Sequence, residues 1–129
     1  MDLTLQQPED YLFVREISEQ GIRVGEEWYT QPLIISAKQL IKDWNVDDVH
    51  HMDENSLERI IELSAEIVLL GTGTKQHFPS PELMMMFHRR DIGIEIMSTD
   101  AACRTFNVLV AEERRVVAAL MPVQRCLTS

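Results

Sequence analysis

Apolar and polar residues alternate along the first third of the chain with the spacing of β-strands. Between residues 11 and 17 every second side chain falls on the same face. A second strand is expected over 22–30, interrupted near Gly25 by a bulge, with Gly21 in the preceding turn. Short apolar runs at 32–36 and 40–44 add two more. Strands so closely spaced predict antiparallel pairing.

The apolar spacing becomes helical after residue 53. Asn55 with Glu58 three positions later resembles a capping box and predicts the start of a first helix. Ser80 followed by Pro81 predicts the start of a second helix. This second helix should run to about residue 90, and Gly93 is expected to cap its end.

A third helix is expected to begin at Ser98 or Thr99, which would act as its N-cap. Its apolar stripe repeats every three to four residues and faces the core. The stripe consists of Ala102, Phe106, Leu109 and Val110.

Between and after these helices lie apolar strands at 65–70, 94–97 and 115–121. Apolar residues on both faces are typical of a covered parallel sheet joined by right-handed crossovers. Residues 53–121 therefore read α-β-α-β-α-β, and the N-terminal strands extend the sheet or form a second, smaller one. The predicted fold class is α/β (α+β), in three layers. We expect residues 1–129 to form one domain, with 1–9 as a loose N-terminal lead-in.

Charge and composition exclude several functions. Asp and Glu number 21 against 12 Lys and Arg, a formal charge of −9, which disfavours nucleic acid and anionic membranes as partners. No apolar stretch is long enough to cross a bilayer, and the first residues lack the pattern of a signal peptide. Cys103 and Cys126 are far apart in sequence and without a CxxC motif, so we expect reduced thiols and a cytoplasmic protein.

The stretch GTGTKQHFPSP, residues 71–81, lies between a strand and a helix, where many proteins bind phosphate. A P-loop would need glycine in place of Thr74 and a hydroxyl residue in place of Gln76. A dinucleotide motif would need a third glycine, again at position 76. Glu82 and Asp100 already place negative charge at the two helix starts nearby. Phosphate binding is therefore disfavoured, and a structural turn is favoured.

Loops that follow successive parallel strands emerge at the same edge of a sheet, which is where α/β proteins bind ligands. We therefore expect residues 71–73 to lie near residues 98–100 at the start of the third helix. A buried Asn107 amide needs a partner; we favour a structural hydrogen bond to the loop backbone over a ligand. The candidate pocket or interaction site consists of Gly71, Thr72, Gly73, Gln76, Phe78, Thr99, Asp100, Arg104 and Asn107.

Other chemistry is less well supported. Adjacent His50 and His51 point in different directions on either a strand or a helix and are poorly placed to share a metal. The sequence identifies no catalytic residues, no metal ligands and no cofactor site. Cys103 near a helix start could have a lowered pKa, although a buried, inert thiol is commoner. The methionines at 84–86 surround much of the second helix and could form a surface for self-association.

Several motifs taken in order resemble a known family. They are Ile67–Gly73, Phe78, Gly93–Met97, Thr99 with Ala101–Ala102, Thr105–Asn107, and Arg115–Pro122. They resemble small domains of unknown function from bacteria and archaea, whose mitochondrial relatives are assembly factors of respiratory complex I (alpha subcomplex assembly factor 3). The resemblance implies a three-layer β/β/α fold without established enzymatic activity. The family usually has a glycine before the arginine that opens the last strand. Residues 111–115 contain none, so the third helix must end differently.

Two functions follow as hypotheses. The first is a non-enzymatic interaction or assembly factor whose protein partners include components of a respiratory complex. The second is a small-molecule-binding protein or enzyme that uses the loops at the carboxyl edge of the sheet. Self-association through Met84, Met85 and Met86 is compatible with either.

Overall fold

The computed structural model describes residues 11–46 and 48–123. The predicted lead-in at residues 1–9 and the thiol of Cys126 lie outside this part of the chain. A five-stranded sheet, in the order β5-β4-β8-β6-β7, forms the centre of the molecule. Its strands are β4 (Leu33–Ser36), β5 (Leu40–Ile41), β6 (Ile67–Thr72), β7 (Gly93–Met97) and β8 (Val116–Met121). As predicted, β6, β7 and β8 are parallel, whereas β4 and β5 pair antiparallel.

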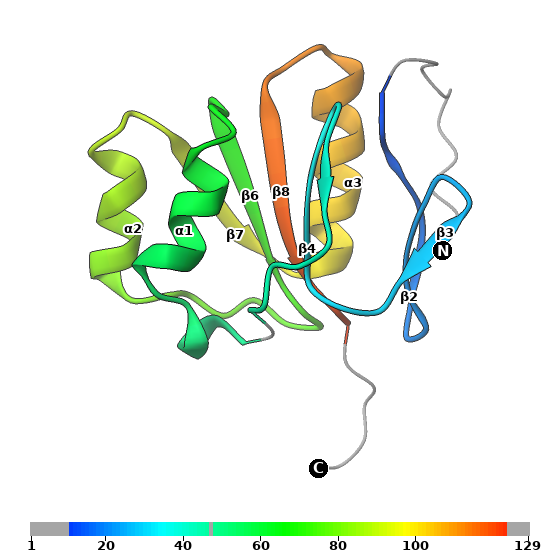
Figure 1. Ribbon diagram of the computed structural model, residues 1–129, viewed down its shortest axis with the longest axis horizontal. Coiled ribbons are helices and arrows are strands. Elements are labelled where there is room, and N and C mark those ends of the chain that lie inside the picture. Colours follow the sequence, from blue (N-terminus) through cyan, green and yellow to red (C-terminus); the bar gives the residue numbers. More distant parts are fainter. Residues whose placement is uncertain (1–10, 47, 124–129) are drawn as a thin grey trace.

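Both faces of this sheet are covered, which gives three layers and confirms the predicted fold class (Figure 1). One face packs against α1 (Glu54–Ile61), α2 (Pro81–His88) and the short η1 (Val49–His51). The other face packs against α3 (Thr99–Ala111) and a separate three-stranded antiparallel sheet. The strands of this small sheet are β1 (Val14–Ser18), β2 (Gly21–Val24) and β3 (Glu27–Tyr29).

Alternating side chains of the central strands divide the core into two clusters. In β6, Val68 and Leu70 face α1 and α2, whereas Leu69 faces α3 and the small sheet. The parallel strands must be apolar on both sides because both sides are covered. This is why the near-continuous apolar runs at 67–70 and 116–121 predicted parallel strands correctly.

The connections between the parallel strands determine at which end of the sheet a binding site is expected. The chain passes from β6 to its neighbour β7 through α2, and returns from β7 to β8 through α3 on the opposite face. The helices that follow the adjacent strands β6 and β7 thus lie on opposite sides of the sheet. Loops diverge at such a point, which is where open α/β sheets commonly place a binding site.

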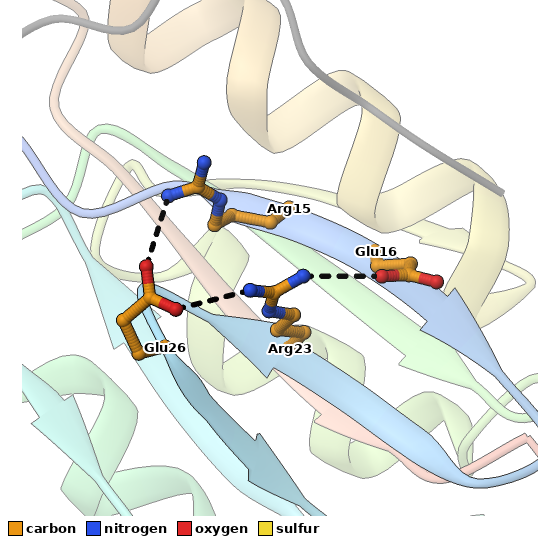
Figure 2. A network of polar contacts seen from close by, with 4 residues as sticks. All are labelled: Arg15, Glu16, Arg23 and Glu26. Atoms are coloured by element: carbon orange, nitrogen blue, oxygen red, sulfur yellow. Dashed lines mark hydrogen bonds and ion pairs between the residues drawn. The ribbon is translucent and has the colours of Figure 1, made fainter.

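Charged side chains form a network on the outward face of the small sheet. Figure 2 shows Arg23 between two carboxylates, 3.4 Å from Glu16 Oε1 and 3.1 Å from Glu26 Oε1, with Arg15 3.9 Å from the same Glu26 side chain. These side chains are partly or largely exposed, so each pair contributes little to stability. Their charges make this face a solvated surface.

Several local predictions were wrong. The expected bulge near Gly25 is instead a tight hairpin, in which Val24 pairs with Glu27 and Gly25 has a φ of 61°. The first helix is capped by Asp53 rather than Asn55. The Asp53 carboxylate accepts a hydrogen bond from Ser56 N at 2.9 Å, and Ser56 Oγ accepts one from Asp53 N at 2.8 Å. The capping box therefore closes with Ser56, not Glu58.

The helix ends rely on residues other than glycine. Gly93 does not cap α2 but begins β7, and Asp91 takes the left-handed conformation with a φ of 60°. Glu113 does the same after α3, with a φ of 62°. Around Glu113 the amides of residues 113 and 114 donate to the carbonyls of Val110 and Leu109, at 2.9 and 3.0 Å. This Schellman motif explains how α3 ends without the family's usual glycine.

Asn107 connects α3 to the small sheet. Its Oδ1 accepts from Val14 N and its Nδ2 donates to Val14 O, both at 2.8 Å. Strand β1 departs from regular pairing with β2 between Val14 and Glu16. The Asn107 amide therefore satisfies the backbone of β1 at an irregular position, as a neighbouring strand would.

Candidate functional site

The loops that follow β6 and β7 meet, as predicted. Gly73 N donates to Thr99 Oγ1 at 2.8 Å, and Thr99 N donates to Gly73 O at 2.8 Å. This two-way contact joins the turn after β6 to the first residue of α3. Gly73 has a φ of 95°, a conformation that favours glycine.

Thr99 also holds the end of β8. Its hydroxyl donates to the main-chain carbonyl of Met121 at 2.6 Å while it accepts from Gly73. The side chain is fully buried. Three segments, at 73, 99 and 121, are thus fixed by one hydroxyl group, whose donor and acceptor functions are both occupied.

Backbone packing at this point is very close. A Cβ atom built on Gly71 would lie 2.9 Å from Thr99 Cα, a distance that real Cβ atoms essentially never show. Gly71 is therefore required for the approach of α3 to β6. This accounts physically for the first glycine of the GTG motif.

Thr72 and Gln76 also bond main-chain groups with their side chains. Thr72 Oγ1 donates to Lys75 O at 2.6 Å and accepts from His77 N at 3.0 Å. Gln76 Nε2 donates to Ile96 O in β7 at 2.8 Å. These bonds hold the loop in a defined conformation.

Phe78, by contrast, points away from the core. Its side chain is 63% exposed, the largest value among the large hydrophobic residues that the structure describes as exposed. The next residue, Pro79, is buried, so the loop is anchored on both sides of the ring. The loop therefore presents an aromatic side chain to solvent from a fixed backbone.

The start of α3 supplies the other candidates. Asp100 Oδ2 accepts from Arg104 Nη1 at 2.6 Å, one helical turn away. Asp100 Oδ1 has no hydrogen-bond partner among the described residues. Asn107 does not belong to this group: the prediction that it bonds the loop is wrong, because it faces β1 about two turns further along α3.

Phosphate chemistry has little support at this edge. The Gly73 amide is already bonded to Thr99. At the start of α2, Ser80 Oγ accepts from Leu83 N and Pro81 has no amide hydrogen. At the start of α3, Ser98 caps Ala101 N. The free amides that attract anions to helix starts are largely occupied.

Cys103 is not an activated thiol. It is completely buried, and this burial raises the pKa of its thiol far above the usual range, with the nearby Asp100 carboxylate acting in the same direction. Burial thus outweighs the position of Cys103 near a helix start. Within residues 11–46 and 48–123, no group of three or more His, Cys, Asp or Glu residues could hold a metal ion.

Two of the three methionines in α2 pack against the core. Met84 and Met86 are partly buried against the part of the core that lies between the central sheet and helices α1 and α2. The side chain of Met85 is 43% exposed. Met85 and Met86 line a shallow groove between α1 and α2, together with Glu54, Pro81, Glu82 and Arg89.

The main partners of this site could not be read from sequence. Thr99 bonds Met121, 22 residues away, and Asn107 bonds Val14, 93 residues away. The only sign in the sequence was that Thr99 and Asn107 are polar residues next to the apolar stripe of the third helix.

Comparison with known proteins supplies relatives. A family model described as "Protein of unknown function (DUF498/DUF598)" matches residues 14–121. A "13 kDa major membrane protein" of Francisella tularensis is 35% identical over 96 residues, covering 74% of this chain and 76% of the relative. The NADH dehydrogenase (ubiquinone) 1 alpha subcomplex assembly factor 3 of Xenopus tropicalis is 30% identical over 117 residues, covering 89% of this chain.

The chain spans 63% of the length of that assembly factor. Among solved structures, a crystal structure of a Bordetella parapertussis protein superposes with a TM-score of 0.83 at 30% identity. It covers 90% of this chain and 99% of the other. No helix in the described part of the chain is both long and apolar enough to cross a membrane.

Proposed function

Because the chain belongs to the DUF498/DUF598 family of proteins of unknown function, we propose that it is a non-enzymatic assembly factor that binds a subunit of a respiratory complex. The name of the Xenopus relative supports the partner class, since that protein is described as an assembly factor of NADH dehydrogenase. The chain shares about three-fifths of that protein's length. The proposal therefore concerns the shared domain and its surface.

The observation that carries the proposal is the contrast between polar and aromatic side chains where the turn after β6 meets the start of α3. The side chains of Thr72, Gln76 and Thr99 bond the protein's own backbone, whereas Phe78 is 63% exposed. Protein interfaces obtain much of their binding energy from a few aromatic anchors on well-ordered backbone. An exposed ring on a rigid loop suits such an anchor.

A small-molecule site at the same edge is the weaker alternative. A ligand would need polar groups that converge on a free space. Here Gln76 is committed to Ile96 O and Thr99 to Met121 O. The carboxylate oxygen Asp100 Oδ1 is the one atom of the candidate set that favours it.

The name of one relative raises the question of how this chain would reach a membrane. The Francisella protein is called a membrane protein. A formal charge of −9 opposes direct adsorption to anionic lipid. We propose that the chain works in the cytoplasm, where a reduced thiol such as Cys103 is usual, and reaches the membrane by binding a membrane-bound protein.

Site-specific crosslinking tests this directly. A photoreactive phenylalanine analogue is placed at position 78, or at Val108 as a control that is 45% exposed on α3, in cells that naturally make the protein. We expect position 78 to capture a respiratory-complex subunit or another assembly factor, and position 108 to capture neither. Equal capture from both positions, or capture of unrelated proteins alone, would contradict the proposal.

A further inference from the structure

A cleft of about 380 Å³ opens at the amino ends of β6 and β8, at the opposite edge of the central sheet from Phe78. Its walls come from the turn after α1, the turn after α3 and the turn between β4 and β5. Apolar side chains form most of the lining, among them Leu63, Ala65, Val110 and Val116. The volume and the apolar lining are typical of sites for small organic ligands.

Three cations line the same cleft: Lys38, Arg114 and Arg115. They are three of only 12 basic residues in a chain with a formal charge of −9. A cluster of basic groups in an acidic protein is an electrostatic feature that would attract a small anion.

The contacts of these cations leave donors available. Arg114 uses Nε to bond Glu66 Oε1 at 3.1 Å, and Arg115 uses Nη1 to bond Ser64 O at 3.0 Å. These bonds orient the two guanidinium groups without engaging their other terminal nitrogens among the described residues. Lys38 Nζ lies 6.0 Å from the centre of the Tyr11 ring, which also lines the cleft.

Two acidic residues, Glu66 and Glu113, reduce the net positive charge of the cleft. Glu66 already neutralises much of Arg114, and the Arg114 side chain lowers the pKa of that carboxyl group. Glu113 also lines the cleft and, exposed like the three cations, offsets a further part of their positive charge. Arg115 and Lys38 therefore carry most of the attraction for an anion.

We propose that this cleft binds a small organic carboxylate with an aliphatic body. The carboxylate would accept hydrogen bonds from Arg115 and Lys38, since guanidinium groups bind carboxylates with matching geometry. The aliphatic part would lie on the apolar walls. The cleft and the Phe78 loop are at opposite sheet edges, so this proposal stands or falls independently of the assembly role.

Octanoate is a suitable probe. Its binding to the full-length protein is measured by NMR, from the chemical shifts of the amides of Ala65, Val110 and Val116. We expect saturable shifts at these amides. Octanamide keeps the alkyl chain but has no charge, and it should bind at least about tenfold more weakly than octanoate. Acetate keeps the charge but lacks the alkyl chain, and it should also bind at least about tenfold more weakly.

Two variants connect binding to the cations. Arg115→Gln and Lys38→Gln should each weaken octanoate binding, the former by about tenfold. Arg89→Gln, which removes an exposed charge just after α2, is the matched control and should bind as the wild type does. Lys38→Gln keeps the test valid if loss of the Ser64 contact destabilises the Arg115 variant. No saturable shift, or equal affinity for octanoate in Lys38→Gln and Arg89→Gln, would overturn the proposal.

Discussion

Replacing Thr99 by valine tests whether one hydroxyl fixes the loop edge. Valine has nearly the shape of threonine, so the change removes the hydroxyl without opening a cavity. The Thr99 side chain is fully buried, donates to Met121 O at 2.6 Å and accepts from Gly73 N at 2.8 Å. The substitution leaves two buried main-chain groups without partners.

The expected cost follows from these two groups. An unsatisfied buried donor or acceptor costs about 1–3 kcal/mol. The extra buried methyl group of valine returns part of this, about 1 kcal/mol. Two such groups together cost about 2–6 kcal/mol, so we expect Thr99→Val to lower the free energy of unfolding by about 1–5 kcal/mol, a large share of the roughly 5–15 kcal/mol typical of natural proteins.

Urea unfolding followed by circular dichroism measures the effect. With an m-value of about 2 kcal/mol per M, the midpoint should fall by about 0.5–2.5 M. Thr105→Val, a partly buried threonine on the same helix, is the matched control and should shift the free energy by less than about 1 kcal/mol. If Thr99→Val unfolds at the same urea concentration as this control, the hydroxyl does not hold the loop edge.

The remaining predictions concern separate parts of the fold. Asn107→Ala leaves both main-chain groups of Val14 unpaired and should cost about 2–5 kcal/mol in urea unfolding; a cost under about 1 kcal/mol would show that the amide is dispensable. Glu113→Gly relieves a left-handed residue with a φ of 62° and should raise the melting temperature, since the strain is worth about 1 kcal/mol, whereas an unchanged or lower value would refute the strain. Glu66→Gln probes the ion pair with Arg114, whose hydrogen bond depresses the pKa of Glu66 below that of an unperturbed glutamate. The stabilisation from this depressed pKa is complete above pH 4.5 and is lost as pH falls through the folded-state pKa, so the melting temperatures of the two proteins should converge in acid; a constant difference would contradict this.

Local signals in the sequence identified much of the fold. Ser80 before Pro81 placed the start of α2 correctly, because an N-cap hydroxyl and a proline in the first turn act within a few residues. The apolar runs in β6 and β8 predicted parallel strands because both sheet faces are covered. Such features depend on neighbours along the chain, which the sequence shows directly.

Other features depend on geometry that the sequence does not show. Asp53 and Asn55 are both good N-cap residues, and only the reciprocal bonds with Ser56 select Asp53. The hairpin at Gly25 and a bulge there have the same apolar pattern. Asn107 was expected near the loop because it shares a helix with Thr99, but its position along α3 directs it to Val14.

The central claim is that Phe78 is a docking residue, and complementation measures it most directly. Cells that lack the protein are supplied with wild type, Phe78→Ser or Val108→Ser, and NADH:ubiquinone oxidoreductase activity is measured in their membranes. Both positions are exposed, at 63% and 45%, so each variant should fold, with a change in stability of no more than about 0.5 kcal/mol. We predict that wild type and Val108→Ser restore activity and that Phe78→Ser does not. Full restoration by a folded Phe78→Ser protein would contradict the claim.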